Sequence, residues 1–69
     1  MFNGLVLRTL RIKKHFSCSE IIFELDKVGL RISRPTILNW ELGKTEPKAS
    51  QIYKISKFFD IPMEKFYRD

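Results

Sequence analysis

The stretch SRPTILNWELG, residues 33–43, decides the fold because its two ends mark one short helix. Ser33 is a good N-cap, since its hydroxyl can accept a hydrogen bond from a free amide N–H of the first turn. Pro35 falls in that first turn, where a missing N–H costs nothing. Gly43 can adopt the left-handed conformation that ends a helix. The sequence therefore predicts a helix over residues 34–42.

This predicted helix has two unequal faces. Ile37 and Trp40 are three residues apart and form one narrow apolar stripe that can dock on a core. The other positions must face away from that core, and they are Arg34, Pro35, Thr36, Leu38 and Asn39. A short helix that is held by one edge and varied on the other is suited to recognition by a partner.

The rest of the chain predicts four more short helices and no sheet. Their expected ranges are Phe2–His15, Ser17–Val28, Ala49–Phe59 and Met63–Tyr67. Ser17 and Glu20 match a capping box, in which the serine hydroxyl and the glutamate each accept a backbone N–H. Gly29 is expected to end the second helix, and Leu30 and Ile32 of the following linker are expected to be buried.

Apolar spacing predicts the core. The inward positions expected from helical periodicity are Val6, Leu7, Leu10, Ile21, Ile22, Leu25, Val28, Ile52, Ile55, Phe59 and Phe66. Leu5 and Ile12 lie seven residues apart on another face of the first helix, so they form either a second patch or part of a wide core stripe. The wide stripe is the preferred interpretation. Phe23 falls off the main stripe and is expected to be exposed.

Composition limits the possible functions. A chain of 69 residues is expected to form a single domain, residues 1–69, with a modest core. The net charge of +5 favours an acidic partner, and nucleic acid is the commonest one. One cysteine and one histidine leave no basis for a metal site, and we expect no cofactor. Neither a signal peptide nor a bilayer-spanning apolar run is evident, so a cytoplasmic location in a bacterial host and no membrane partner are expected.

The pattern from Leu10-Arg11 and Phe16-Ser17 through S-R-x-T-I-x-x-W-E-x-G-K-x-x-P, residues 33–47, resembles the Cro/CI-type helix-turn-helix family of phage and bacterial repressors. This resemblance implies an all-α, five-helix domain whose third helix enters the major groove of DNA. It also implies a structural ion pair between Arg11 and Glu41, which would join the first helix to the end of the third.

The resemblance implies two sets of contact residues. Base edges, or the surface of a protein partner, would be met by Arg34, Pro35, Leu38 and Asn39, whereas phosphates would be met by Ser33, Thr36, Lys44, Thr45 and Lys48. Arginine can bind guanine with two hydrogen bonds, and asparagine can bind adenine. Lysine suits phosphate, and each such contact steepens the salt dependence of binding.

Three features depart from the family pattern. Cys18 occupies the start of the second helix, where the family usually has a polar amide side chain that contacts phosphate. Pro35 and Leu38 offer no hydrogen bond to a base. The segment between Leu25 and Ser33 is longer than the family's tight turn, which predicts a second helix extended to Val28. That helix carries three acidic side chains, Glu20, Glu24 and Asp26, which would repel the phosphates of a duplex wherever they face it.

Two functions therefore remain open. The first is transcriptional regulation in a phage-type genetic switch by binding operator double-stranded DNA. The alternative is an antirepressor, or modulator of repression, that binds a second helix-turn-helix repressor protein through the outer face of residues 34–42, a layout that resembles switch proteins of lactococcal temperate phages. No arrangement of paired carboxylates, nucleophile and base, or phosphate-binding glycines points to an enzyme or to a small-molecule substrate.

Overall fold

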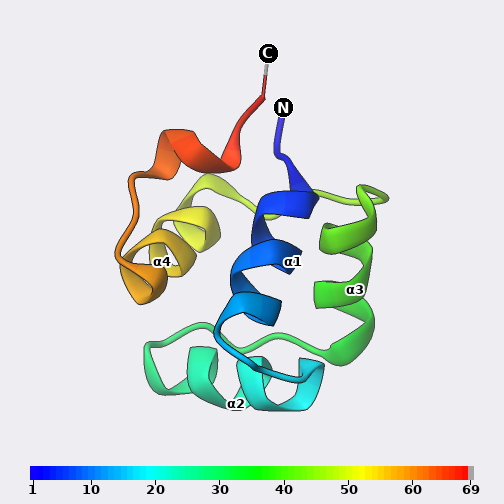
Figure 1. The fold of residues 1–69 in the computed structure, drawn as a ribbon, viewed down its shortest axis with the longest axis vertical. Helices are drawn as coiled ribbons and strands as arrows, with labels where there is room; N and C mark the ends of the chain where they lie inside the picture. The colour runs from blue at the N-terminus through cyan, green and yellow to red at the C-terminus, as the bar shows by residue number, and fades with distance from the viewer. Residues whose placement is uncertain (69) are drawn as a thin grey trace.

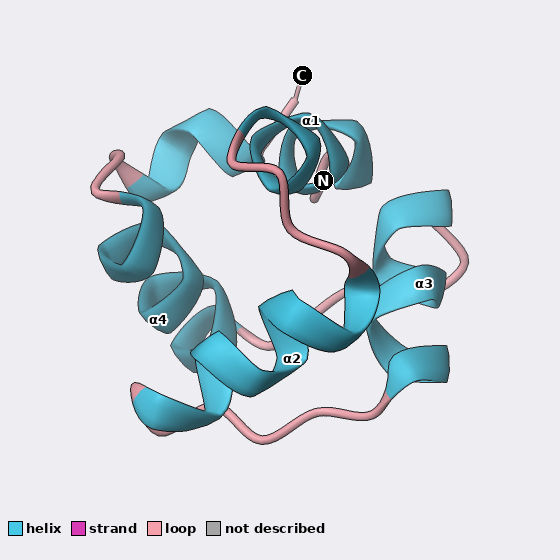
Figure 2. Ribbon diagram, turned by 60° about the horizontal axis from the view of Figure 1, so that its bottom comes forward, coloured by secondary structure: helices cyan, strands magenta, loops and turns pink. Residues whose placement is uncertain are grey.

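The computed structural model describes residues 1–68, which fold into four α-helices and one 3-10 helix (Figure 1). The elements are α1 (Gly4–Lys13), α2 (Cys18–Lys27), α3 (Arg34–Leu42), α4 (Ala49–Phe59) and the 3-10 helix η1 (Met63–Phe66). In the view of Figure 1, α1 lies between α4 and α3 with α2 below them, and Figure 2 shows the four helices arranged around one centre with α4 and α3 on opposite sides. The all-α class is as predicted, but the fifth element is a single 3-10 turn rather than an α-helix.

The predicted bounds of α3 and α4 are confirmed, and the capping chemistry explains α3. The Ser33 hydroxyl accepts a hydrogen bond from the Thr36 amide at 3.3 Å, and Gly43 ends the helix with a φ of 79°. The capping box of α2 is also present. The Glu20 amide donates to the Ser17 hydroxyl at 3.1 Å, and the Ser17 amide donates to a Glu20 carboxylate oxygen at 2.8 Å.

The first helix is shorter than predicted at both ends. It begins at Gly4, where the Asn3 side chain caps it by accepting the Leu5 amide at 3.2 Å. Phe2 is extended instead of helical, because its ring is buried in the core and forms a stacked pair with Phe66, with 5.9 Å between the ring centroids. A β-bridge joins Phe2 to Tyr67, so the start of the chain pairs with the segment after η1.

The second helix ends at Lys27, one residue before its predicted end. Val28 was expected in the core but is 46% exposed. The chain turns at Gly29, which has a φ of 88°, and the Leu30 amide then donates to the carbonyl of Leu25. Leu30 is therefore the next residue buried after Leu25, and Ile32 follows it into the core as predicted.

The buried apolar residues form one cluster between the helices. Its members are Phe2, Leu7, Ile21, Leu25, Leu30, Ile32, Ile37, Trp40, Ile52, Ile55, Phe59 and Phe66, and Val6, Leu10, Phe16 and Ile22 pack against it while partly exposed. The preferred interpretation of Leu5 and Ile12 as core was wrong, because they are 59% and 52% exposed. Helix α1 packs on α3 and η1, and the side chains of Leu5 and Ile12 remain exposed outside that packing.

Gly4 allows α1 to approach the backbone of α3. A Cβ atom at Gly4 would overlap the carbonyl oxygen of Trp40 and would lie 2.7 Å from the carbonyl oxygen of Glu41. The first turn of α1 therefore rests directly on the last turn of α3, which fixes how α3 is presented. Within residues 1–68, no helix is long and apolar enough to cross a membrane.

Candidate nucleic-acid interface

The inner edge of α3 is buried and sets the rotation of the helix. Ile37 is fully buried, Trp40 is 3% exposed, and Glu41 is 6% exposed. These positions recur at a spacing of three and four residues, so they lie on one side of a helix. Because this side faces the core, the opposite side of α3 is presented outward.

Glu41 joins α3 to α1 through a two-pronged ion pair with Arg11. Arg11 Nε donates to one Glu41 carboxylate oxygen at 2.7 Å and Nη2 donates to the other at 3.0 Å, while Nη1 donates to the carbonyl of Phe16 at 3.0 Å. The hydrogen bond to Glu41 raises the pKa of Arg11 against the opposing effect of burial. The Arg11 guanidinium, the Glu41 carboxylate and the Phe16 carbonyl are thus hydrogen-bonded to one another at the junction of α1, α3 and the turn into α2.

The outer face of α3 carries the side chains that were predicted to meet bases or a partner. Arg34 and Pro35 are exposed, Leu38 is 36% exposed, and Asn39 is half-buried beside them. No residue within 1–68 forms an ion pair with Arg34. The guanidinium of Arg34 is therefore available at the start of the helix, and the apolar Leu38 lies one turn further on.

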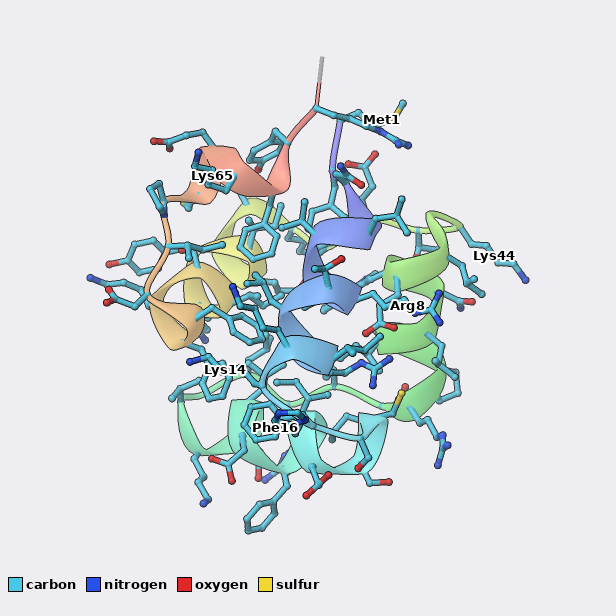
Figure 3. All side chains as sticks on the ribbon, viewed as in Figure 1. Met1, Arg8, Lys14, Phe16, Lys44 and Lys65 are labelled. Atoms are coloured by element: carbon cyan, nitrogen blue, oxygen red, sulfur yellow. The ribbon has the colours of Figure 1, made fainter. Side chains whose placement is uncertain are left out.

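The residues predicted to meet phosphates lie at the two ends of α3. At the start, the hydroxyl oxygens of Ser33 and Thr36 are 2.8 Å apart and share a hydrogen bond. Past the end, Lys44, Thr45 and Lys48 are exposed on the loop that leads to α4, and Figure 3 shows the Lys44 side chain extending away from the molecule. Two basic side chains of this loop thus lie beyond the C-terminal end of the helix whose first turn carries Arg34.

The loop after α3 is held in place by contacts that the sequence analysis missed. Pro47 is buried, and a Glu46 carboxylate oxygen accepts the Phe2 amide at 2.9 Å. The amides of Lys44 and Thr45 both donate to the carbonyl of Asn39. These contacts connect the basic loop to the first residues of the chain, a link between distant segments that no local pattern could indicate.

The acidic side chains of α2 are each engaged by a neighbour. Glu24 accepts from Lys27 at 3.2 Å, and Asp26 accepts from Arg31 at 3.2 Å. Glu20 serves the capping box, and the hydrogen bonds from the Ser17 amide and hydroxyl lower the pKa of its carboxyl group. Cys18, in the first turn of α2, is partly buried. The repulsion that these carboxylates exert on a nearby phosphate is therefore reduced, although the pairs are exposed and weak.

The connection from α2 to α3 completes a two-helix unit whose second helix is presented outward (Figure 2). Helices α2 and α3 pack against each other, and the link between them spans residues 28–33. A capped second helix, with an arginine in its first turn and basic residues beyond its end, is the arrangement of a helix-turn-helix DNA-binding protein.

Comparison with known families agrees with this class. A family model described as Helix-turn-helix matches residues 25–66, which is more than half of the chain and includes all of α3, α4 and η1. The chain therefore belongs to the helix-turn-helix family of the Cro/CI type, whose members are DNA-binding transcriptional regulators and not enzymes. Neither the search of curated proteins nor that of solved structures found a match.

Proposed function

We propose that this protein regulates transcription in a phage-type genetic switch by binding operator DNA through the outer face of α3. The observation that carries the proposal is the opposition of the two edges of α3. Ile37, Trp40 and Glu41 are buried, whereas Pro35 and Leu38 of the same helix are exposed and Arg34 is exposed at its first residue. A helix fixed in this way can hold its outer side chains in one register against the major groove.

The proposed roles follow from the chemistry of the exposed groups. Arg34 donates two hydrogen bonds to the O6 and N7 atoms of a guanine, and Asn39 pairs with the N6 and N7 atoms of an adenine. Leu38 and Pro35 contact thymine methyl groups. Phosphates are bound at the two ends of the helix by Ser33, Thr36, Lys44, Thr45 and Lys48. The net charge of +5 supports association with a polyanion.

The engagement of the α2 carboxylates weakens one objection to DNA as the ligand. Glu24 and Asp26 are each paired with a cation, and Glu20 is hydrogen-bonded within its own helix. The acidic character of α2 is therefore a weaker argument against a duplex than its carboxylate count alone implies.

A salt series tests this proposal. A duplex selected from a random library is titrated with the protein at salt concentrations between about 50 and 200 mM, and binding is followed by fluorescence anisotropy. Over this range a protein with six to ten phosphate contacts loses about 10³- to 10⁵-fold in affinity. With the two lysines and the polar groups above, we expect a smaller but clear loss of affinity, and Lys48→Ala reduces the slope of log K against log salt by about 0.9. A flat salt response would remove DNA as the main ligand.

A second candidate function rests on Pro35 and Leu38. Both are exposed at the centre of the outer face of α3, with Arg34 and Asn39 beside them. An apolar centre with a polar rim is the layout of a protein interface. In this alternative, the protein is an antirepressor that binds the repressor of the same switch through this face.

The Leu38→Asp variant separates the two candidates. Its operator affinity and its binding to a purified helix-turn-helix repressor of its own host are measured together, with the melting temperature as a control for folding. Loss of repressor binding with unchanged operator affinity supports the antirepressor. Loss of operator affinity with no measurable binding to the repressor in the unmodified protein supports operator binding alone.

A further inference from the structure

We infer that the protein has a second interaction surface, along the junction of α1 and α3, that binds an acidic amphipathic helix of a protein partner. This α1–α3 groove is defined by Leu5, Arg8, Leu38 and Leu42, with the Arg11–Glu41 pair as its floor. Two hollows adjoin there. One has Leu5, Arg8, Glu41 and Leu42 among its lining residues, and the other is lined by Arg8, Arg11, Leu38, Glu41 and Leu42. The inference does not depend on operator binding.

The apolar side chains of the groove are exposed and do not belong to the core. Leu42 is 67% exposed and Leu5 is 59% exposed, on two helices that pack against each other. Leu38 lies one turn before Leu42 on α3, and both side chains line the same hollow. Scattered surface leucines need no explanation, but a set that lines one groove marks an interaction site.

The charge of the groove selects the partner. The only carboxylate that lines either hollow is that of Glu41, and Arg11 already binds both of its oxygens. Arg8 lies at the junction of α1 and α3 (Figure 3), and within residues 1–68 it forms no ion pair. Arg68 lines the same hollow as Leu5 and adds further positive charge. A partner with carboxylates beside its apolar side chains is therefore complementary to this surface.

The shape of the groove favours a helix. Its two walls are helices, and a third helix can place apolar side chains between them at a spacing of three and four residues. From Leu5 to Arg11 the wall of α1 is about 9 Å long, at about 1.5 Å per residue. A partner helix of two to three turns is thus long enough to place a leucine near each end and a glutamate opposite Arg8.

Other occupants fit less well. Two copies of this chain related by a two-fold axis would bring Arg8 of each copy near the same basic surface of the other, where like charges repel. A lipid surface requires a protruding apolar stripe, whereas Leu5 and Leu42 line hollows between two helices. A duplex offers phosphates to Arg8 and a thymine methyl group to Leu38, but it leaves Leu5 and Leu42 without an apolar partner.

The test uses three synthetic helical peptides of about 12 residues that share one leucine stripe at helical spacing. The first has glutamates beside the stripe, the second has lysines, and the third has glutamines. Each is titrated into the ¹⁵N-labelled full chain, and amide shifts are followed by NMR. We expect the glutamate peptide to bind most tightly, with the largest shifts at Leu5, Arg8 and Leu42.

Matched variants locate the contact and test its charge. Leu42→Ser should weaken the glutamate peptide about fivefold, as for a central apolar contact. Arg8→Glu should reverse the preference so that the lysine peptide binds more tightly. Phe23→Ser removes another exposed apolar side chain, from the outer side of α2, and should change nothing. Operator affinity is measured for each variant, and we expect it to be retained by Leu42→Ser, so a failure of this inference is distinct from a failure of DNA binding.

Several results would overturn the inference. They are equal binding of all three peptides, shifts that cluster away from the groove, or an unchanged preference in Arg8→Glu. Concentration-dependent dimerisation that Leu42→Ser abolishes would assign the groove to a second copy. A membrane would be the ligand of the groove if none of the peptides bound, the protein bound to vesicles of anionic phospholipid, and Leu42→Ser did not bind to them.

Discussion

The two edges of α3 differ in what surrounds them, although they belong to the same nine-residue helix. The inner edge has Ile37, Trp40 and Glu41 at 6% exposure or less, and α1 is packed against it. The outer edge has Arg34 and Pro35 exposed, and no described residue pairs with Arg34. The inner contacts therefore determine where the helix lies, and the outer side chains are free to meet a ligand.

This difference separates stability from recognition. A change at the inner edge should lower the free energy of unfolding, because it disturbs packing or leaves a buried charge without a partner. A change at the outer edge should leave the free energy of unfolding nearly constant and change only ligand affinity. The following predictions test that separation.

The largest effect is expected where α1 touches the backbone of α3. Gly4→Ala places a methyl group against the carbonyl oxygens of Trp40 and Glu41, so α1 must move. We expect a loss of about 3 kcal/mol, at the upper end for overpacking, measured by urea unfolding. Gly43→Ala is the matched control, because no atom lies within 4 Å of the added methyl and its cost is the strain of a positive φ, about 1–2 kcal/mol. Equal losses in the two variants would show that close packing at Gly4 is not important.

The Arg11–Glu41 pair should give the next largest effect. Arg11→Ala leaves a carboxylate that is 4% exposed without its cation, and we expect a loss of about 2–3 kcal/mol. Replacing both residues by leucine removes the charge as well as the partner, so the double variant should be less destabilised than Arg11→Ala. The single variants Arg11→Leu and Glu41→Leu complete the cycle. If the loss of stability in the double leucine variant equals the sum of the losses in these two single variants, the two residues act independently.

Arg34→Ala probes the outer edge directly. Operator affinity should fall by about 1–3 kcal/mol, and the preference for guanine at one position should relax, because one two-pronged contact is lost. The free energy of unfolding should change by less than about 0.5 kcal/mol, as for an exposed side chain. Competition with duplexes altered at single base pairs gives the preference. Uniform weakening for all duplexes would instead place Arg34 on phosphate.

The smallest effect is expected at the capping box of α2. Hydrogen bonds from Ser17 lower the pKa of Glu20 below its ordinary value of 4.5, so its contribution to stability is present above pH 4.5 and is lost as the pH falls through the lower folded value. Glu20→Gln should therefore flatten the decline of melting temperature with acid, with little change at pH 7. A parallel shift of the whole pH profile would assign the effect to helix propensity and not to ionisation.

Local chemistry predicted α3 well because both of its ends are encoded by neighbouring residues. Ser33 and Gly43 give the bounds, and the stripe of Ile37 and Trp40 tells which positions face outward. The family resemblance added Glu41 and its partner Arg11. The bounds and the apolar stripe need no knowledge of distant segments, which is why local chemistry could predict them, whereas the pairing of Glu41 with Arg11, 30 residues away, came from the resemblance alone.

Long-range packing explains what the sequence could not predict. Leu5 and Ile12 have apolar side chains on one side of α1, but only the position of the neighbouring helices shows that this side is uncovered. Phe2 was expected to be helical and instead stacks on Phe66 near the other end of the chain. The anchoring of the basic loop by Glu46 and Phe2 likewise joins residues 44 positions apart.

The central claim is that the outer edge of α3 meets DNA while the inner edge only supports it, and amide NMR of the labelled protein tests it most directly. The selected operator duplex is added stepwise to the folded protein. We predict that the largest amide shifts fall at Arg34, Leu38 and Asn39 and at Lys44 and Lys48, with small shifts in α4. Shifts centred on α4 and η1, with α3 unchanged, would contradict the account.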